Sequence, residues 1–252
     1  MTRRPILAGN WKMHMLTGEA IQLAGALAKE VGELTDRDVV LIPPFTALAA
    51  VHGAIAGTRI GLGAQNGHWE PKGAFTGEIS MPMIKDAGCQ YVTIGHSERR
   101  QYFGETNQSC RAKIQAALVA GLTPIYCLGE TLEQREANRT FQVVETQLAE
   151  GLAGFNADEL ATLVIAYEPV WAIGTGKTAT PEQAQEVHAF IRGRLAEAFG
   201  PARAEATRIQ YGGSVKPDNV DELMAKPDID GALVGGAALK ADGFARIVKF
   251  LS

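Results

Sequence analysis

Glu168 stands at the end of an apolar run, and a glycine-containing segment follows it directly. Residues 163–167 have the length and composition of a buried strand. Pro169 ends regular structure there, and the two glycines within residues 170–177 allow backbone N–H groups to approach a ligand closely. A lone glutamate at a strand end is more often a solvated carboxylate, but this segment behind it favours a functional one. The pattern predicts a general base beneath a mobile lid that excludes water.

An imidazole and an amine follow two other apolar runs. His96 on its own would more often be a structural histidine, but residues 97–100 directly after it have the composition of a helix start. The positive end of the helix dipole disfavours an imidazolium, so we expect a neutral ring that donates a hydrogen bond to a carbonyl oxygen. Asn10, Trp11 and Lys12 follow the first apolar run, and we expect Lys12 to point across the same rim as His96.

Two glycine pairs follow the last two apolar runs. The first is Gly212-Gly213-Ser214, and the second is Gly235-Gly236. Either pair alone would be consistent with a simple turn. Together they match the phosphate site that barrels build from backbone N–H groups and the start of a short helix. The sequence therefore predicts proton transfer on a phosphorylated substrate.

The sequence gives no pattern for a metal or a cofactor. His14, His52, His68 and His188 share no spacing typical of metal ligands, and no cluster of carboxylates suggests a divalent ion. Cys127 lies inside an apolar run and is interpreted as a core residue rather than a nucleophile. No G-x-G-x-x-G motif follows the first strand, which argues against a dinucleotide. We expect chemistry without metal or cofactor.

Composition indicates an ordinary globular protein. The chain has 252 residues, 46% of them hydrophobic, and a net charge of −4, which argues against a nucleic-acid partner. No apolar run is long enough to cross a bilayer, so we expect no membrane contact, and the charged first residues are not followed by the apolar segment of a signal peptide. The cysteines are odd in number and scattered, as is typical of reduced thiols in the cytoplasm. They are Cys89, Cys110 and Cys127.

Short apolar runs alternate with stretches of helical periodicity along the whole chain. The expected strands are residues 6–10, 39–43, 60–65, 91–96, 123–128, 163–168, 208–213 and 231–236. The clearest expected helices are residues 19–31, 108–120, 139–152 and 181–199, the last with Thr180 as N-cap. Eight βα units without a linker predict a single-domain α/β fold over residues 1–252, a (β/α)₈ TIM barrel. A doubly wound open sheet is the alternative, since strand number alone does not prove closure.

The longest segment without periodicity is residues 65–80, after the third expected strand. A loop of this length inside a compact domain usually binds a ligand or a partner. Its tip carries Phe75, an aromatic side chain that a monomer would have little reason to expose. The loop is therefore predicted to serve binding or assembly.

Several motifs taken together resemble the triosephosphate isomerase family along essentially the whole chain. They are Gly9-Asn10-Trp11-Lys12, Gly73-Ala74-Phe75-Thr76-Gly77-Glu78, Ile94-Gly95-His96-Ser97-Glu98-Arg99-Arg100, residues 166–179, Tyr211-Gly212-Gly213-Ser214-Val215 and Leu233-Val234-Gly235-Gly236-Ala237. The family usually carries a serine where Ala238 stands, a departure that concerns phosphate affinity rather than identity.

The resemblance implies interconversion of dihydroxyacetone phosphate and D-glyceraldehyde 3-phosphate through an enediolate, in glycolysis and gluconeogenesis. Glu168 would be the base, neutral His96 would polarise the carbonyl, and Lys12 with Asn10 would offset the developing charge. This pairing of glutamate and neutral histidine is the known pattern of the family. Glu98 would orient the site. The phosphate ligands would be Gly174, Ser214, Gly235 and Gly236.

The resemblance also implies a homodimer and a closing lid. The loop over residues 65–80 would insert into a second subunit near residues 10–15. The expected interface residues are Phe75, Thr76, His14 and Met15. Residues 169–171 and 177–179 would be the hinges of the lid. Two other functions remain: another barrel enzyme acting on a phosphosugar, and a barrel that binds without catalysis.

Overall fold

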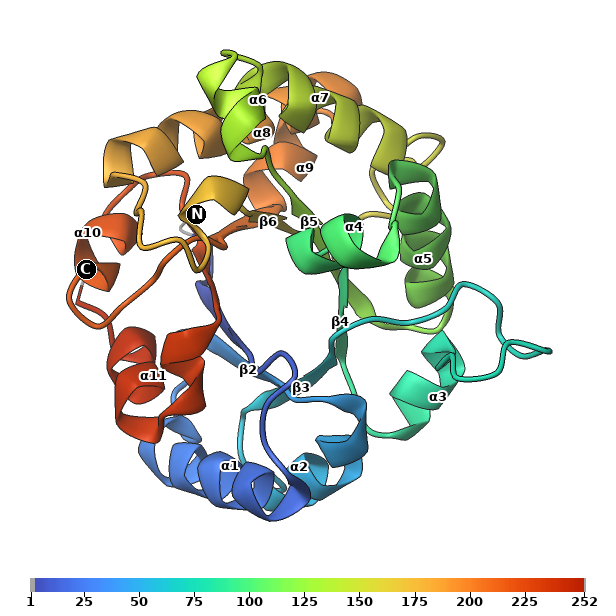
Figure 1. The fold of residues 1–252 in the computed structure, drawn as a ribbon, viewed down its shortest axis with the longest axis vertical. Coiled ribbons are helices and arrows are strands. Elements are labelled where there is room, and N and C mark those ends of the chain that lie inside the picture. The colour runs from blue at the N-terminus through green and yellow to red at the C-terminus, as the bar shows by residue number, and fades with distance from the viewer. Residues whose placement is uncertain (1–2, 252) are drawn as a thin grey trace.

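The computed structural model describes residues 3–251, and a closed barrel of eight parallel strands forms its centre (Figure 1). The strands are β1 Ile6–Asn10, β2 Asp38–Ile42, β3 Gly61–Ala64, β4 Tyr91–Ile94, β5 Thr123–Leu128, β6 Val164–Tyr167, β7 Arg208–Tyr211 and β8 Gly231–Val234. They follow one another around the barrel in chain order, and β1 pairs with β8, with Ile6 opposite Gly231. This last pairing closes the sheet and rules out the doubly wound alternative.

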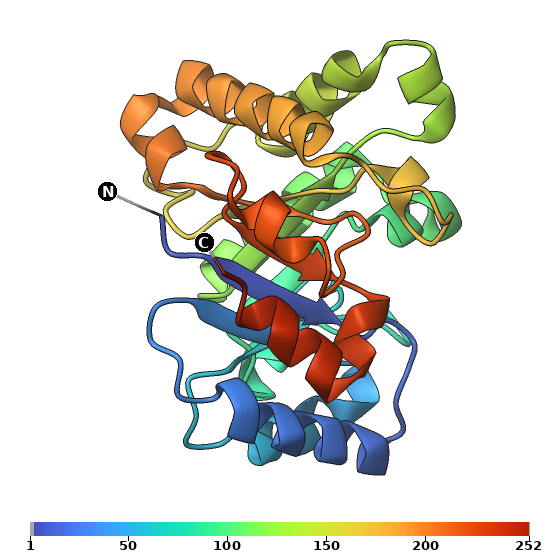
Figure 2. The same ribbon diagram turned by 90° about the vertical axis from the view of Figure 1, so that its left-hand side faces the viewer.

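Helices surround the barrel and connect successive strands (Figures 1 and 2). They are α1 Thr17–Val31, α2 Leu48–Ala54, α3 Met81–Asp86, α4 Ser97–Phe103, α5 Asn107–Val119, α6 Leu132–Glu136, α7 Thr140–Gly151, α8 Pro181–Phe199, α9 Pro201–Ala206, α10 Val220–Met224 and α11 Ala241–Val248. The described residues also form the short 3₁₀ turns η1 Phe45–Ala47, η2 Val170–Ala172 and η3 Gly236–Leu239. Within residues 3–251, no helix combines the length and the apolarity needed to cross a membrane.

The predicted elements are confirmed, and most differences lie at their ends. The predicted N-cap of α8 is correct, because Thr180 Oγ1 accepts a hydrogen bond from Gln183 N at 3.2 Å. The strand predicted over residues 91–96 ends at Ile94, since Gly95 turns the chain with φ +76°. Gly236 likewise begins η3 instead of ending β8. His96 therefore lies just beyond β4, and Gly236 just beyond β8.

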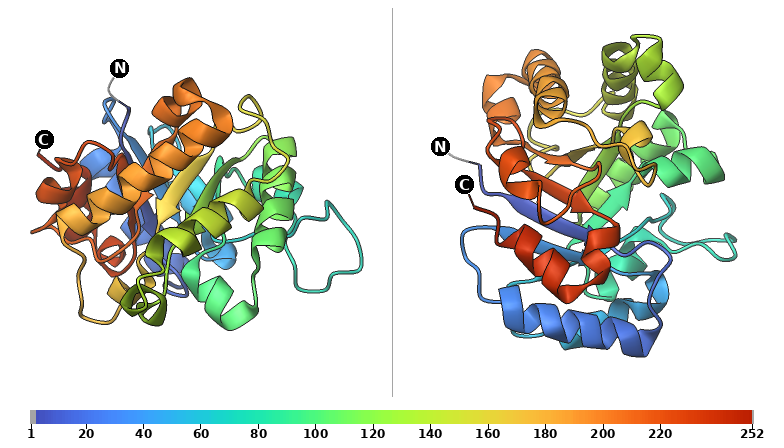
Figure 3. Two further views of the ribbon diagram at one scale, coloured as in Figure 1. Left: turned by 90° about the horizontal axis from the view of Figure 1, so that it is seen from above. Right: turned by 60° about the vertical axis from the view of Figure 1, so that its left-hand side comes forward.

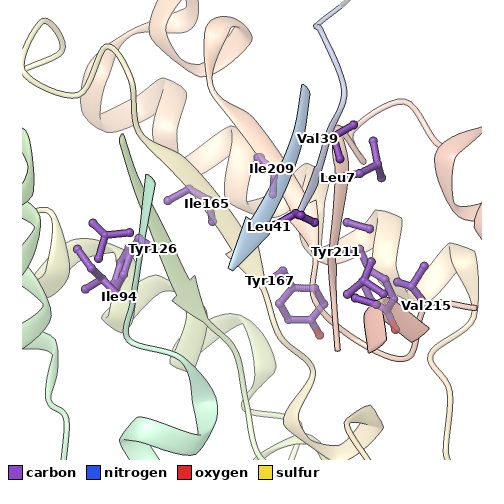
Figure 4. Close-up of a cluster of buried hydrophobic side chains, with 14 of the residues drawn as sticks. Leu7, Val39, Leu41, Ile94, Tyr126, Ile165, Tyr167, Ile209, Tyr211 and Val215 are labelled. Atoms are coloured by element: carbon purple, nitrogen blue, oxygen red, sulfur yellow. The ribbon is translucent and has the colours of Figure 1, made fainter. Parts of the chain in front are cut away.

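Apolar side chains fill both faces of the sheet, as expected of parallel strands covered by helices. Alternate strand residues such as Ile6 and Ala8 point inward and fill the barrel, while Leu7 points outward to the helices. Figure 4 shows part of the outer layer, including Tyr126 and Tyr167. The barrel is a packed core, so chemistry is confined to its rim.

The loop over residues 65–80 leaves the barrel between β3 and α3 (Figures 1 and 3). At its base, His68 N donates to Ile79 O at 2.8 Å. Toward its tip, the ring of Phe75 lies 4.4 Å from that of His68. The projecting loop thus has internal packing and keeps a defined shape away from the barrel.

Candidate active site

The carboxyl ends of β1, β4 and β6 bring the predicted base, imidazole and amine to one rim. Asn10 is the last residue of β1, His96 lies two residues beyond β4, and Glu168 directly follows β6. Asn10, His96 and Glu168 are all buried, while Lys12 is half-buried. Sequence positions as far apart as 10 and 168 therefore form one cluster.

Glu168 is held in place by hydrogen bonds from the start of α4. Its Oε2 accepts a hydrogen bond from Ser97 N at 2.9 Å, and its Oε1 lies 3.4 Å from Ser97 Oγ. The residue is 2% exposed. Glycines on the neighbouring strand ends make room for it: a Cβ on Gly212 would lie 2.8 Å from Glu168 Cγ, and one on Gly129 only 1.9 Å from Glu168 O. Any larger residue at Gly212 or Gly129 would therefore displace Glu168.

His96 is the N-cap of α4, which fixes the direction of its ring. Its Nδ1 accepts a hydrogen bond from Glu98 N at 3.3 Å, so this nitrogen carries no proton. The proton of a neutral ring must then reside on Nε2, which lies 3.0 Å from Glu168 Oε1. The helix start predicted after His96 therefore selects the tautomer that donates into the site.

Lys12 adopts a backbone conformation that is uncommon for a residue with a side chain, with φ +52°. Two hydrogen bonds stabilise it: Lys12 N donates to Asn10 Oδ1 at 2.9 Å, and Lys12 O accepts from Gln65 Nε2 at 2.7 Å. Its Nζ lies 2.7 Å from Glu98 Oε1. A Cβ on Gly235 would come within 3.4 Å of Lys12 Cε. Glu98 thus contacts both the amine and, through its backbone, the imidazole.

The predicted lid begins at η2 and contains two exposed glycines. Gly174 and Gly176 have φ of +69° and +80°, and a Cβ at either would meet nothing within 4 Å. Thr175 Oγ1 donates to Trp171 O at 2.6 Å, which tightens the first half of the lid. Gly174 therefore lies on an open, exposed segment.

Glu130 anchors the lid, and the sequence analysis missed it. This fully buried carboxylate lies beyond β5 and accepts a hydrogen bond from Trp171 Nε1 at 2.9 Å. It also accepts from Tyr167 Oη at 3.1 Å and pairs with Arg135 Nη1 at 3.1 Å. Burial, with the nearby Glu130 charge, raises the pKa of Tyr167 well above its ordinary value, so the hydroxyl remains a donor. The position of Glu130, just after the fifth predicted strand, was the signal by which the sequence could have indicated it.

The second glycine pair begins a short helical turn at the rim, as predicted for a phosphate site. Gly235 precedes η3, and Ser214 is half-buried after β7. Ala238 is fully buried, and its Cβ would lie 3.1 Å from a Cβ on Gly9, with Phe244 equally close. The departure at Ala238 therefore lies in the core, where a methyl group packs well.

Beside Glu168, a cavity of about 640 Å³ opens between α4, the residues after β5 and the lid. Ser97, Glu98, Trp171 and Ile173 are among its lining residues. His96, Lys12 and the second glycine pair are not among the lining residues, so the cavity lies beside the catalytic cluster, between Glu168 and the lid.

Cys127 lies inside the barrel, and burial raises the pKa of its thiol well above the ordinary value. The thiol therefore stays protonated at neutral pH. Its interpretation as a core residue agrees with this environment.

The predicted interface residues all have exposed surface. Phe75 is 44% exposed despite its contact with His68, and Thr76 beside it is exposed. On the segment after β1, His14 is exposed and Met15 is half-buried with φ +77°. Nearby Met13 is 94% exposed.

Comparisons with known proteins give one consistent result. A sequence model of the TIM family, described as triosephosphate isomerase, matches residues 5–251. A triosephosphate isomerase of Herpetosiphon aurantiacus is 58% identical over 248 residues, 98% of this chain and 99% of the relative. One of Moorella thermoacetica is 59% identical with the same coverage. Among solved structures, triosephosphate isomerase from Bartonella henselae is similar with a TM-score of 0.89 and 41% identity, covering 98% of each chain.

Proposed function

This chain belongs to the triosephosphate isomerase family, and we propose that Glu168, His96 and Lys12 carry out its reaction. The protein interconverts dihydroxyacetone phosphate and D-glyceraldehyde 3-phosphate, a step of glycolysis and gluconeogenesis. The two alternatives, a different phosphosugar enzyme and a barrel without catalysis, do not agree with this family membership.

Glu168 acts as the base. It removes a proton from the carbon beside the substrate carbonyl and returns it to the neighbouring carbon, so the carboxylate is regenerated in each turnover. The observation that carries this role is its 3.0 Å contact with His96 Nε2 at the rim, because this contact places the base directly beside the hydrogen-bond donor, so that both can reach one substrate that separates them. The lid beside it supplies the cover that such chemistry needs.

His96 donates its Nε2 proton toward the carbonyl oxygen and thereby stabilises the enediolate. A neutral donor of this kind takes back a proton from one oxygen as it gives one to the other, which moves protons between the two oxygens without a net change. Lys12 adds positive charge, and Asn10 fixes its backbone. Glu98 holds the amine in the resting site at 2.7 Å and releases it to the substrate.

The phosphate group binds to backbone N–H groups and one hydroxyl. Gly235 and Gly236 at the start of η3 provide N–H groups, and Ser214 provides its hydroxyl and its backbone. Gly174 adds a further N–H when the lid closes, because it stands on the exposed part of the lid. Remote phosphate binding of this kind supplies energy for closing the lid.

The functional unit is a homodimer. The projecting loop carries Phe75 and Thr76, and the segment with His14 and Met15 offers exposed apolar surface for the partner subunit to cover. Gln65, at the base of the loop, already holds Lys12 O at 2.7 Å, so the loop and the catalytic amine are structurally linked.

The whole chain, residues 1–252, forms one catalytic domain located in the cytoplasm. One barrel uses strands from both ends of the chain, which supports a single domain; residues 1, 2 and 252 lie outside the described part. Cys89, Cys110 and Cys127 are buried free thiols, as is common in a reducing compartment.

An assay of D-glyceraldehyde 3-phosphate turnover, coupled to reduction of the dihydroxyacetone phosphate formed, tests the proposal. Wild-type protein is expected to turn over the substrate without added metal, and inorganic phosphate should inhibit competitively. Retention of near-normal turnover in Glu168→Gln would show that another group is the base.

A further inference from the structure

Arg100 of α4 connects the end of β4 to the end of β5 through four hydrogen bonds. Its Nε donates to Gly95 O at 2.8 Å, directly before His96 in the chain. Its Nη2 donates to Cys127 O at 3.2 Å and to Tyr126 Oη at 3.3 Å. Its Nη1 donates to Asn107 Oδ1 at 2.7 Å. One guanidinium therefore ties together β4, β5 and the start of α5.

Tyr126 and Gln147 extend this network to the other half of the site. Tyr126 Oη donates to Gln147 O at 2.7 Å. The side-chain amide of Gln147 pairs with both backbone groups of Gly129: Oε1 accepts from Gly129 N at 2.7 Å, and Nε2 donates to Gly129 O at 3.2 Å. A Cβ on Gly151 would lie 2.2 Å from Tyr126 Oη, so α7 has a glycine where the tyrosine needs room.

Each end of the network contacts one of the proposed catalytic residues through its backbone. Gly95 has φ +76°, and a Cβ there would lie 3.0 Å from Arg100 Nη2, so the guanidinium packs directly on the residue before His96. A Cβ on Gly129 would lie 1.9 Å from Glu168 O, so this glycine packs directly on the backbone of the base. Gly129 also precedes Glu130, which anchors the lid through Trp171.

We propose that Arg100, Tyr126 and Gln147 are positioning residues, which hold His96 and Glu168 at the correct distance and orientation relative to one another. The inference rests on the proposed roles of those two catalytic residues. The network links two backbone segments, at Gly95 and Gly129, that come from different strands. The hydrogen bonds of the three side chains go to backbone groups, to one another and to Asn107 Oδ1 instead of the substrate-facing atoms of His96 or Glu168, so their effect is on the geometry of the site.

The chemistry of the network explains its residue types. Only a planar guanidinium can donate to acceptors in several directions at once, whereas a lysine amine in the same place would reach only some of them. Burial raises the pKa of Tyr126, which keeps its hydroxyl a donor to Gln147 O. A small displacement of reacting groups is enough to reduce the rate, since about 1 Å of misplacement can cost about 10²-fold.

Two conservative variants test the proposal with little change in volume. Tyr126→Phe removes only the hydroxyl, and Gln147→Met removes only the amide. We expect each to lower kcat about three- to tenfold while KM and the inhibition constant of inorganic phosphate change less than about twofold. The double variant should lose little more than the worse single variant, because both break one continuous network. Arg100→Lys should have the largest effect, about tenfold or more.

Matched controls separate positioning from general stability. Tyr91→Phe removes a tyrosine hydroxyl at the opposite end of β4, and Gln142→Met removes an exposed amide from the same helix as Gln147. Both should keep wild-type kcat. The Nε2–H signal of His96 in nitrogen-labelled protein should shift in Tyr126→Phe and stay unchanged in Tyr91→Phe.

If Tyr126→Phe and Gln147→Met lower only the melting temperature and leave kcat and the His96 signal unchanged, the network is merely structural and the proposal is wrong. A rise in KM with unchanged kcat would equally overturn it. Failure of the proposed function is distinguishable, since it would appear as turnover in Glu168→Gln. Should Arg100→Lys fail to fold, Tyr126→Phe and Gln147→Met still decide between a positioning role and a structural one.

Discussion

His96 Nε2 and Glu168 Oε1 lie 3.0 Å apart in the resting site, so the hydrogen-bond donor and the base bind each other. The contact has a direct consequence for catalysis, because a substrate must separate the two. When the substrate carbonyl oxygen accepts the hydrogen bond from His96 Nε2, the Glu168 carboxylate loses that hydrogen bond. It is then free to approach the substrate carbon beside the carbonyl. Ser97 N and Oγ supply the remaining hydrogen bonds that hold Glu168 at rest. Substrate binding thus activates the base by competing for its partner.

Replacement of Glu168 by Gln should remove proton abstraction while preserving the shape of the side chain. General-base catalysis contributes about 10²–10⁴-fold, so we expect kcat to fall by at least about 10²-fold. The inhibition constant of inorganic phosphate should stay within about threefold, because the phosphate ligands are elsewhere. Glu186→Gln, on the exposed face of α8, is the matched control and should keep wild-type turnover.

His96 should carry its ring proton on Nε2, because Nδ1 accepts a hydrogen bond from Glu98 N. An NMR titration of nitrogen-labelled protein should show Nε2 protonated and Nδ1 unprotonated near neutral pH. His96→Asn should lower kcat by about 10²–10³-fold with a smaller change in KM, since the lost hydrogen bond strengthens in the transition state. An imidazolium signal for His96 at pH 7 would refute this role.

Phe75→Asp should dissociate the proposed dimer and lower turnover. A carboxylate at the loop tip cannot be buried in a partner without a large desolvation cost. Loss of the partner should leave Lys12, with its φ of +52°, less well ordered, and we expect kcat to fall about tenfold or more. Val119→Asp is the matched control, because Val119 is 79% exposed on α5. Sedimentation that finds a fully active monomer of Phe75→Asp would contradict the proposed link between assembly and catalysis.

His188 should make the protein less stable in mild acid. Its ring is fully buried, Nδ1 lies 3.1 Å from Asp228 O, and desolvation lowers the pKa from the ordinary 6.5 to about 4. Because the folded pKa is the lower one, the unfolded chain binds more protons between these values. The stabilisation is complete above about pH 6.5 and is lost as the pH falls toward 4, at up to about 1.4 kcal/mol per pH unit.

His188→Gln keeps a donor for Asp228 O but cannot titrate. Denaturant unfolding between pH 4 and 7 should therefore show a shallower decline in the free energy of unfolding for His188→Gln than for wild type. His14→Gln, at an exposed position, should leave the slope unchanged. Equal slopes for wild type and His188→Gln would show that another group determines the acid sensitivity.

The sequence predicted the elements and the clustered residues because each has a local signal. Thr180 followed by Pro181 marks the start of α8, and the polar residues Asn10, His96 and Glu168 each follow an apolar run. The barrel then brings these strand ends together by topology alone. Local signals were therefore sufficient to predict those features that depend only on the order of the elements along the chain.

The rest of the site depends on distances that local patterns do not contain. Glu130 and Trp171 are 41 positions apart, and Tyr126 and Gln147 are 21 apart, so no periodicity links them. Short helices such as α6 Leu132–Glu136 have too few residues to show a 3.6-residue period. The strand predicted over residues 91–96 extended too far because a single glycine after an apolar run does not by itself reveal the left-handed turn at Gly95.

Deletion of Ile173–Gly176 should lower isomerisation strongly and release inorganic phosphate. The lid carries the N–H of Gly174, and an enediolate that is solvated and free to rotate can expel the phosphate from its neighbouring carbon. The anchor from Glu130 to Trp171 lies outside the deleted segment, so Glu168 should keep its position. We expect kcat to fall by about 10²-fold or more, with phosphate and methylglyoxal as side products. Adding Glu168→Gln to the deletion should abolish this release, because no enediolate then forms. If the deletion slows isomerisation without any increase in phosphate release, the lid does not protect the intermediate in this protein.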